Sequence, residues 1–438
     1  MNDRGAIILV LLLCFAYTKA QDKNNRPNII YIMTDDLGYA DLSCYGRKDY
    51  TTPNLDKLAI QGMRFTHAYS GGPMCTPTRV SFMTGRYPAR LSLGLIEPID
   101  WTAKDSAIGL TPTIPSLATL LKKVGYHTAL IGKWHLGFKP EFSPIKNGFD
   151  EFFGFHGGGI DYVSHSGPKK KPDLYENDKA VLVEGYSTDI FTDKAIEFVK
   201  RKHDKPFFLS LQHNAPHWPW QGATDGAYHD TMDFKAGGTP QIFAAIMKSL
   251  DDNIGRLMNS LDETGLAKNT VVIFVSDNGG ERFSDMGPLT GRKMLLWEGG
   301  IRVPALVRWP GKIKAGAVTT QPVITMDWTA TILSLAGAKQ DKNLPMDGQN
   351  LLPFLTGKKN EFDRTFYWRV HQRNQQKAIR EGKWKYLKDE KGEYLFNLAI
   401  DQSEKNDLKS IEPDLFQDLK NKYAAWEATV LLPVPLRR

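Results

Sequence analysis

The run Asn28-Ile29-Ile30-Tyr31-Ile32-Met33-Thr34-Asp35-Asp36 is almost continuously apolar and ends in two acidic residues. Far downstream, Val271-Val272-Ile273-Phe274-Val275-Ser276-Asp277-Asn278 has the same design. Continuous runs rich in β-branched residues are typical of strands in a parallel sheet that is covered on both faces. The two runs therefore predict two strands of a buried, mainly parallel sheet.

Both predicted strands end in side chains that carry oxygen. Ligands gather at the carboxyl ends of the strands in parallel sheets. We therefore expect Asp35, Asp36, Asp277 and Asn278 to converge on one hard cation, either calcium or magnesium. Either pair alone is more typical of a turn or a helix cap. Their occurrence together, in a chain that also carries Cys75, favours a metal site.

Two further strands, 126–131 and 207–212, deliver basic groups to the same edge of the sheet. Lys133 and His135 follow the first strand, and His217 follows the second. Lys133, together with Lys293, is suited to neutralise a multiply charged anion. The two histidines have the pKa range for proton transfer near neutral pH.

The stretch Cys75-Thr76-Pro77-Thr78-Arg79 places a potential nucleophile at the start of a predicted helix over 76–84. Pro77 suits a first helical turn, where its missing N–H costs nothing, and Gly85 is a suitable stop. The N–H groups of that turn, with Arg79, favour an anion beside Cys75.

These motifs together resemble the formylglycine-dependent sulfatases of the alkaline phosphatase superfamily. Cys75 to Arg79 matches the signature in which the cysteine is oxidised to formylglycine, and Thr84-Gly85-Arg86-Tyr87-Pro88 extends that match. Gly132-Lys133-Trp134-His135 resembles the second signature. The segment 291–304 resembles the one that carries the second active-site lysine, which points to Lys293. The resemblance covers the chain from Pro27 to the C-terminal sheet.

The resemblance implies a sulfatase (EC 3.1.6 class) that releases sulfate from a sulfated poly- or oligosaccharide. A formylglycine-generating enzyme would be its maturation partner. The implied catalytic residues are Cys75, Arg79, Lys133, His135, His217 and Lys293. The implied ligands of one Ca2+, with Mg2+ as the alternative, are Asp35, Asp36, Cys75, Asp277 and Asn278.

The implied nucleophile is a hydroxyl of hydrated formylglycine at position 75, which attacks sulfur and expels the alcohol. Loss of a proton from the second hydroxyl then releases sulfate and restores the aldehyde. His217 or Lys293 protonates the leaving group, and the sequence leaves both open. His213 remains an alternative to His217 as the histidine that contacts the sulfate.

The substrate side of the pocket is less marked in the sequence. His156 with the glycines after it, and the segment 161–185, are candidates for the pocket wall. Trp218 is a candidate for stacking on a sugar ring, with buried packing as the alternative. The run Lys169-Lys170-Lys171 suits a polyanion or a solvated loop equally.

Two other functions compete with a sulfatase. A phosphodiesterase or phosphonate monoester hydrolase of the same superfamily shares the Cys-x-Pro-x-Arg signature. A catalytically silent binder of sulfated glycans would result if Cys75 stayed unmodified. The basic charge, +7 over 438 residues, comes without a nucleic-acid-binding signature, so a nucleic-acid partner is not expected.

Residues 1–20 predict a secretory signal peptide, with Arg4 before an apolar run and Thr18-Lys19-Ala20 as the cleavage site. No membrane span is expected elsewhere, so the chain is expected to be soluble and either periplasmic or secreted. Of three cysteines, Cys14 leaves with the signal and Cys75 is the modified residue. Only Cys44 then remains, which excludes a disulfide within the mature chain.

The predicted fold class is α/β and resembles alkaline phosphatase, with a large, mainly parallel mixed sheet flanked by helices. Residues 21–358 are expected to form the catalytic domain. Short strands joined by Gly-containing turns, then a helix near 414–430, predict a small C-terminal subdomain over 359–438, with an antiparallel sheet.

Overall fold

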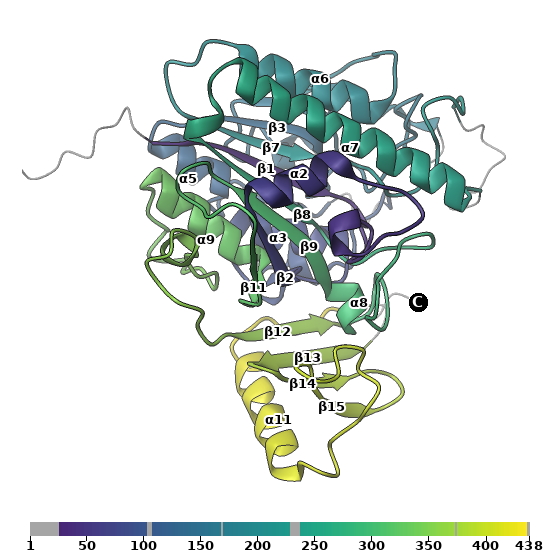
Figure 1. Cartoon of the computed structure of the whole chain (residues 1–438), viewed down its shortest axis with the longest axis vertical. Helices are drawn as coiled ribbons and strands as arrows, with labels where there is room; N and C mark the ends of the chain where they lie inside the picture. Colours follow the sequence, from purple (N-terminus) through teal and green to yellow (C-terminus); the bar gives the residue numbers. More distant parts are fainter. Residues whose placement is uncertain (1–25, 103–106, 168–169, 228–236, 373–374, 436–438) are drawn as a thin grey trace, which may run out of the picture.

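The computed structural model describes residues 26–102, 107–167, 170–227, 237–372 and 375–435 (Figure 1). The predicted signal peptide and Lys169 of the lysine run lie outside the described residues. Across the described ranges, no helix combines the length and the apolar character that crossing a bilayer requires.

A mixed sheet of eleven strands forms the centre of the molecule, in the order β10-β2-β9-β8-β1-β7-β3-β4-β5-β6, with β11 paired to β2. The strands are β1 (Asn28–Thr34), β2 (Met63–Tyr69), β3 (His127–Lys133), β4 (Glu151–Phe155), β5 (Tyr175–Glu176), β6 (Lys179–Ala180), β7 (Phe207–Gln212), β8 (Thr270–Ser276), β9 (Arg302–Arg308), β10 (Ala317–Thr319) and β11 (Val323–Ile324).

β1 lies in the middle of the sheet. It pairs in parallel with both β7 and β8, and every one of its residues is buried. β3 continues the parallel set beyond β7. The two strands predicted at 28–33 and 271–276 are both found, and they are parallel neighbours in the sheet. β9 interrupts this pattern, since it runs antiparallel to both β8 and β2.

Helices cover both faces of this sheet (Figure 1). α2, α6 and α7 pack against one face, where Leu55, Phe191 and Ile254 belong to one apolar cluster. α3, α5 and α9 pack against the other, where Val80 and Leu121 belong to a second cluster. The helices are α2 (Pro53–Gln61), α3 (Cys75–Thr84), α5 (Leu117–Lys123), α6 (Ser187–Lys200), α7 (Pro240–Glu263), α8 (Glu298–Ile301), α9 (Thr325–Ala336), α10 (Leu352–Leu355) and α11 (Pro413–Glu427). Short 3-10 helices span Ser43–Tyr45, Pro88–Arg90, Leu93–Leu95, Pro140–Phe142 and Ala267–Asn269.

The helix that carries the cysteine motif begins one residue before the predicted 76–84. It ends as predicted at Gly85, whose φ of 69° lies in the left-handed region and whose N–H donates to the Ser81 carbonyl at 2.8 Å. A side chain is strained in that conformation, so glycine suits this helix end. The helix start therefore places Cys75 in the first turn, directly beyond β2.

A separate four-stranded antiparallel sheet follows the large one, in the order β12-β13-β14-β15 (Figure 1). Its strands are β12 (Thr365–Val370), β13 (Gln376–Glu381), β14 (Trp384–Lys388) and β15 (Glu393–Asn397). α11 packs against this sheet through Leu419, Tyr423 and Trp426. The same apolar cluster includes Tyr69 and Met74, so the small sheet is seated against the segment that leads to Cys75. The predicted fold class is confirmed.

Candidate active site

The predicted site residues meet at the carboxyl ends of four neighbouring strands. β1 ends one residue before Asp35, β8 one residue before Asp277, and β3 ends at Lys133. The chain after β7 leads to His217, and α3 presents Cys75 from its first turn. Because β8, β1, β7 and β3 are adjacent and parallel, their ends lie at one edge of the sheet.

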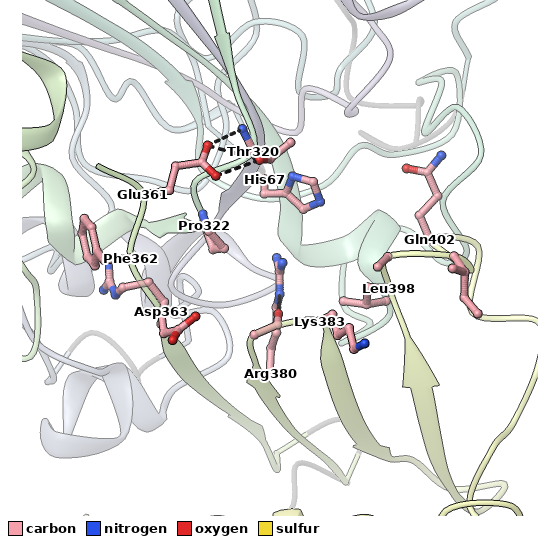
Figure 2. Close-up of a pocket in the computed structure, with 14 residues that line it drawn as sticks. His67, Thr320, Pro322, Glu361, Phe362, Asp363, Arg380, Lys383, Leu398 and Gln402 are labelled. Carbon is pink, nitrogen blue, oxygen red and sulfur yellow. Dashed lines mark hydrogen bonds between the residues drawn. The ribbon is translucent and has the colours of Figure 1, made fainter. Parts of the chain in front are cut away.

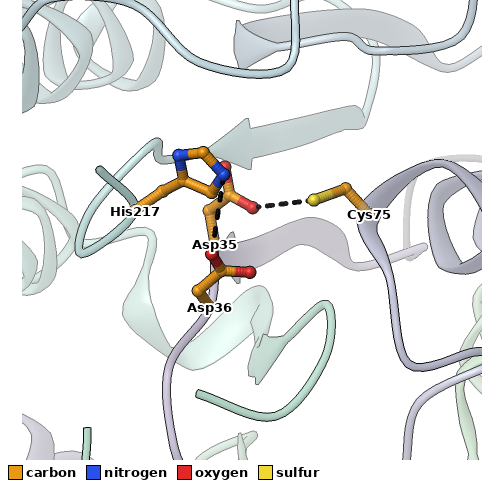
Figure 3. Close-up of side chains that lie close together, drawn as sticks. All are labelled: Asp35, Asp36, Cys75 and His217. Carbon is orange, nitrogen blue, oxygen red and sulfur yellow. Dashed lines mark hydrogen bonds and ion pairs between the residues drawn. The ribbon is translucent and has the colours of Figure 1, made fainter. Parts of the chain in front are cut away.

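The centre of the site is a buried group of four side chains (Figure 3). One potential ligand atom from each of Asp35, Asp36, Cys75 and His217 lies within 4.8 Å of the other three. The Cys75 thiol donates to Asp35 Oδ1 at 3.4 Å, and His217 Nε2 lies 3.5 Å from Asp36 Oδ2. Each of these side chains is at most 3% exposed.

Asp277 and Asn278 complete the acidic side of the site. Asp277 Oδ1 accepts from the backbone N–H of Asp36 at 3.2 Å, and the Asn278 amide donates to Asp36 Oδ1 at 2.7 Å. The Asn278 Oδ1 atom is buried without a hydrogen-bond partner among the described residues. An acceptor left in this way, beside three carboxylates, fits a hard cation that prefers oxygen ligands.

Three cations surround the three carboxylates. Lys133 Nζ lies 2.6 Å from Asp35 Oδ2, and Lys293 Nζ lies 2.6 Å from Asp36 Oδ2. Arg79 Nη2 lies 3.0 Å from Asp277 Oδ2. The formal charges therefore balance, so a divalent cation in this group makes the site net positive and suited to an anion.

Burial shifts the pKa values of these groups in opposite directions according to their neighbours. Burial raises the pKa of Asp36, but the Lys293 ammonium group outweighs it and, with hydrogen bonds from Lys293 and Asn278, brings the pKa down to about 2. Burial and the nearby Asp35 carboxylate raise the pKa of Asp277 to about 7, in spite of Arg79. Burial likewise raises the pKa of the Cys75 thiol, with Asp35 adding to the effect. The unmodified thiol is therefore protonated near neutral pH and is a poor nucleophile.

The two catalytic histidine candidates have their protons fixed by backbone carbonyls. His135 Nε2 lies 2.9 Å from the Ile99 carbonyl, and His217 Nδ1 lies 2.6 Å from the Trp218 carbonyl. A carbonyl only accepts, so the proton sits on Nε2 of His135 and on Nδ1 of His217. Burial lowers the pKa of both rings well below the usual range. In each neutral ring the other nitrogen, Nδ1 of His135 and Nε2 of His217, therefore carries no proton and can accept a hydrogen bond.

The site opens into a pocket of about 280 Å3. Its lining comes from several loops: Met74, Cys75, Pro98, Ile99, Asp100, Trp101, His135, Gly158, Gly159, His217, Trp218, Glu281, Lys293 and Met294. Gly158 and Gly159 approach the histidines closely. A Cβ on Gly158 would lie 2.9 Å from the His135 ring, and one on Gly159 would lie 3.2 Å from the His217 ring. This wall leaves room only for glycine at position 158.

Three predicted substrate residues have different places in the structure. Trp218 lines the pocket. His156 does not line it, because its ring packs on Phe152 and Tyr175 with ring centroids 5.3 and 4.7 Å away. His213 is fully buried outside the pocket lining, and neither of its ring nitrogens has a partner among the described residues. Of the two alternatives His213 and His217, only His217 reaches the pocket.

Several site residues were not predicted. Gln212 accepts from Arg79 Nη1 at 2.9 Å, and its position at the end of β7 could have identified it. The Gly158 carbonyl accepts from Lys133 Nζ at 2.6 Å. Trp101 lines the pocket from a loop that carries no motif, so no pattern in the sequence indicated it. Glu281 also lines the pocket, and its place three residues after Asn278 could have identified it.

Comparison with known proteins matches most of this chain to sulfatases. The Sulfatase family model matches residues 27–338, and the model for the C-terminal part of N-sulphoglucosamine sulphohydrolase matches residues 291–426. The chain is 35% identical over 355 residues to N-acetylgalactosamine-6-sulfatase of Rattus norvegicus. This alignment covers 75% of this chain and 65% of the rat protein. The chain is also 31% identical over 449 residues to steryl-sulfatase of Homo sapiens, in an alignment that covers 84% of this chain and 76% of the human protein.

Among solved structures, that of Ps i-CgsB in complex with k-i-k-neocarrahexaose superimposes with a TM-score of 0.83 at 33% identity. The match covers 94% of this chain and 95% of the other. The resemblance found in the sequence motifs is therefore confirmed over almost the whole described fold. The chain belongs to the type I sulfatase family of the alkaline phosphatase superfamily and is a homologue of arylsulfatases and carbohydrate sulfatases.

Proposed function

We propose that this sulfatase hydrolyses a sulfate ester of a poly- or oligosaccharide, with its nucleophile made from Cys75. The observation that carries the proposal is the group of buried acids and cations around Cys75 at the base of a pocket. The sugar as substrate is supported by the names of two relatives: one is an N-acetylgalactosamine-6-sulfatase, and the other was solved with k-i-k-neocarrahexaose.

The surroundings of Cys75 suit formylglycine better than cysteine. The protonated, buried thiol donates a long hydrogen bond to Asp35 and sits at a helix start, one turn before Arg79. When formylglycine replaces it, the hydrated aldehyde supplies a hydroxyl nucleophile in place of a thiol. Arg79 is positioned by Gln212 and Asp277, so its charge is held beside position 75. Maturation would then require a formylglycine-generating enzyme as partner.

The acidic residues would hold one Ca2+, through Asp35, Asp36, Asp277 and the free Oδ1 of Asn278, with position 75 adjacent. A site made almost wholly of protein oxygens favours Ca2+, because Mg2+ prefers to keep several waters. The cation would neutralise charge on the sulfuryl oxygens. Asp277 supports this assignment, since its raised pKa records the crowding of carboxylates that a cation relieves.

Lys133 and Lys293 are proposed to hold the sulfuryl oxygens from two sides. Each now neutralises one of the acids, and each is free to turn to the substrate when a cation binds those acids. Charges fixed in a buried site stabilise the transition state without the reorganisation that water requires. The bare Nδ1 of His135 is an acceptor for the proton of the attacking hydroxyl.

The leaving group needs a proton, and the structure favours Lys293 over His217 as its source. The proton of neutral His217 is on Nδ1 and is donated to the Trp218 carbonyl. Its Nε2 therefore has no proton to give. Lys293 lines the same pocket as an ammonium group, and nearby carboxylates raise its pKa against the effect of burial.

Sulfate release, measured by ion chromatography, tests the proposal. The enzyme is co-produced with a formylglycine-generating enzyme and given sulfated polysaccharides, their oligosaccharides, and phosphate diester and phosphonate substrates. Cys75→Ala is expected to abolish release, whereas Cys44→Ala, at the half-buried second cysteine, is the matched control and should retain it. Release that persists in Cys75→Ala would refute the mechanism. Turnover of only the phosphorus esters would refute the substrate class.

The proposal also includes export of the enzyme and a role in the degradation of polysaccharides. The signal peptide suggests that the enzyme is exported, to the periplasm or the medium, where sulfated polysaccharides would be degraded. Comparison of the N-terminal sequence of the mature protein with the predicted cleavage after Ala20 tests this directly.

A further inference from the structure

A second and larger pocket, of about 720 Å3, lies between the large sheet and the C-terminal sheet (Figure 2). Its walls come from β2, the loop after β10, the segment before β12, the turn between β13 and β14, and the loop after β15. No residue lines both this pocket and the one above Cys75. Its volume falls in the range of about 300–1,000 Å3 that is typical of small-molecule sites.

Part of the polar lining of this second pocket is already paired. Glu361 accepts from the hydroxyls of Thr319 and Thr320 at 2.8 and 3.1 Å. Arg364 makes a two-pronged ion pair with Asp327, at 2.6 and 2.8 Å. These groups build the walls, and they are not available to hold a ligand.

His67 offers an acceptor to the pocket, and its hydrogen bonds fix which nitrogen that is. The Thr66 hydroxyl donates its proton to the Thr319 carbonyl at 3.0 Å. The Thr66 oxygen, 3.0 Å from His67 Nδ1, must therefore accept the Nδ1 proton. Burial, with Arg302 and Arg380, lowers the pKa of His67 to about 3, which agrees with a neutral ring. Nε2 is thus a bare acceptor, and the ring points into the pocket (Figure 2).

Arg380 and Lys383 offer positive charge to the same space. Arg380 is only 5% exposed, and it donates through Nε to the Gly382 carbonyl and through Nη1 to the Tyr69 hydroxyl. Within the part of the chain that the structure describes, its Nη2 has no partner. The ammonium group of the exposed Lys383 lies 5.6 Å from the centre of the Trp384 ring and makes no ion pair with a described residue. Asp363 adds a carboxylate to the lining that has no partner in the described ranges.

A ligand that satisfies this lining must carry both an anionic group and hydroxyl donors. The anion would bind Arg380 Nη2 and Lys383, and the hydroxyls would donate to His67 Nε2 and Asp363. We propose that this pocket is a second carbohydrate site, which binds an anionic, sulfate-bearing sugar unit away from the catalytic pocket. The choice of a sulfated sugar rests on the proposed function. A simple inorganic anion would leave the acceptors His67 and Asp363 without donors.

Binding without turnover tests the proposal. In a Cys75→Ala background, calorimetry measures the binding of k-i-k-neocarrahexaose and of chondroitin sulfate and heparin hexasaccharides. Lys383→Glu and, separately, His67→Phe are expected to weaken one binding component at least tenfold for at least one of these sugars. Lys391→Glu, an exposed lysine in the next turn, is the matched control and should leave every component unchanged.

The outcomes separate this proposal from the proposed function. If no sugar shows a component sensitive to Lys383 and His67, there is no second carbohydrate site. Inorganic sulfate that binds here as tightly as the sugars would show a site for a free anion instead. In the Cys75-containing enzyme, Lys383→Glu should leave sulfate release from a small aryl sulfate unchanged, so loss of the second site and loss of catalysis are read in different assays.

Discussion

Gly158→Ala tests whether the glycine wall sets the geometry of the catalytic groups. The added Cβ would lie 2.9 Å from Cε1 and Nε2 of His135, whereas ordinary contacts begin near 3.4 Å. Either the ring or the loop must therefore move by about 0.5 Å. His135 is only 2% exposed and hydrogen-bonded to Ile99, and the Gly158 carbonyl accepts from Lys133. Movement of the ring displaces a side chain that lines the pocket, and movement of the loop displaces the carbonyl that holds Lys133.

A displacement of about 1 Å in an active site costs on the order of 100-fold in rate, so a displacement half as large predicts a fall in kcat/KM of about 10-fold. The crowding should also lower the free energy of unfolding by about 1–3 kcal/mol. Backbone strain adds nothing, because the φ of Gly158 lies outside the left-handed region. Sulfate release gives kcat and KM, and urea denaturation gives the free energy of unfolding.

Gly392→Ala is the matched control for this prediction. Gly392 lies in the turn between β14 and β15, where the nearest atom to an added Cβ is the Tyr394 hydroxyl at 3.6 Å, an ordinary contact. Activity and stability should both remain at wild-type values. If Gly158→Ala keeps its kcat/KM within twofold of wild type, the close contact with His135 is not what positions the catalytic groups. A loss of stability with full activity would be equally damaging to the argument.

Three other changes have definite expected outcomes. Lys293→Gln should lower kcat much more for a sugar sulfate than for 4-nitrophenyl sulfate, because a phenolate leaves without a proton; equal losses would exclude Lys293 as the acid. Removal of metal with EDTA should abolish sulfate release and lower the melting temperature, with Ca2+ restoring both better than Mg2+; unchanged activity after verified removal would contradict the metal site. Burial raises the pKa of Asp173 to about 7, so its stabilising contribution is complete below about pH 4 and is lost as pH rises through 7. Asp173→Asn should flatten that part of the unfolding free energy plotted against pH, and an unaltered pH profile would disprove the shift.

The large sheet was predictable where each strand is apolar at every position. β1, β7 and β8 are buried along their whole length, and their sequences reflect it. β2 and β12 alternate between buried and partly exposed positions and were not predicted. β9 was missed for a different reason. All its residues are buried, but it follows α8 directly, within a segment interpreted only for its lysine motif.

The site was predictable to the extent that its groups directly follow strands. Asp35, Lys133 and Asp277 need no knowledge of tertiary structure beyond the rule that parallel strands end at one edge. His156 shows the limit of that rule, because it also follows a strand, β4, yet its ring turns to Phe152 and Tyr175. The direction of a side chain one residue beyond a strand depends on the loop that follows. Here Asp173 fixes that loop, by accepting from the backbone N–H groups of His156 and Gly157 at 3.1 and 2.8 Å.

The residues proposed to bind the sulfate were easier to predict from the sequence than those that would face the sugar, and this difference has a physical cause. A sulfuryl group needs several fixed charges at short range, and here strand ends and a helix start hold most of them, with Lys293 added from the loop before α8. Those positions are marked in the sequence by apolar runs and by glycine. A sugar ring needs flat surfaces and scattered acceptors, which loops can supply in many ways, as Trp101 and Glu281 do here. The reaction can therefore be inferred from short motifs, whereas the identity of the sugar depends on how four or five loops meet above them.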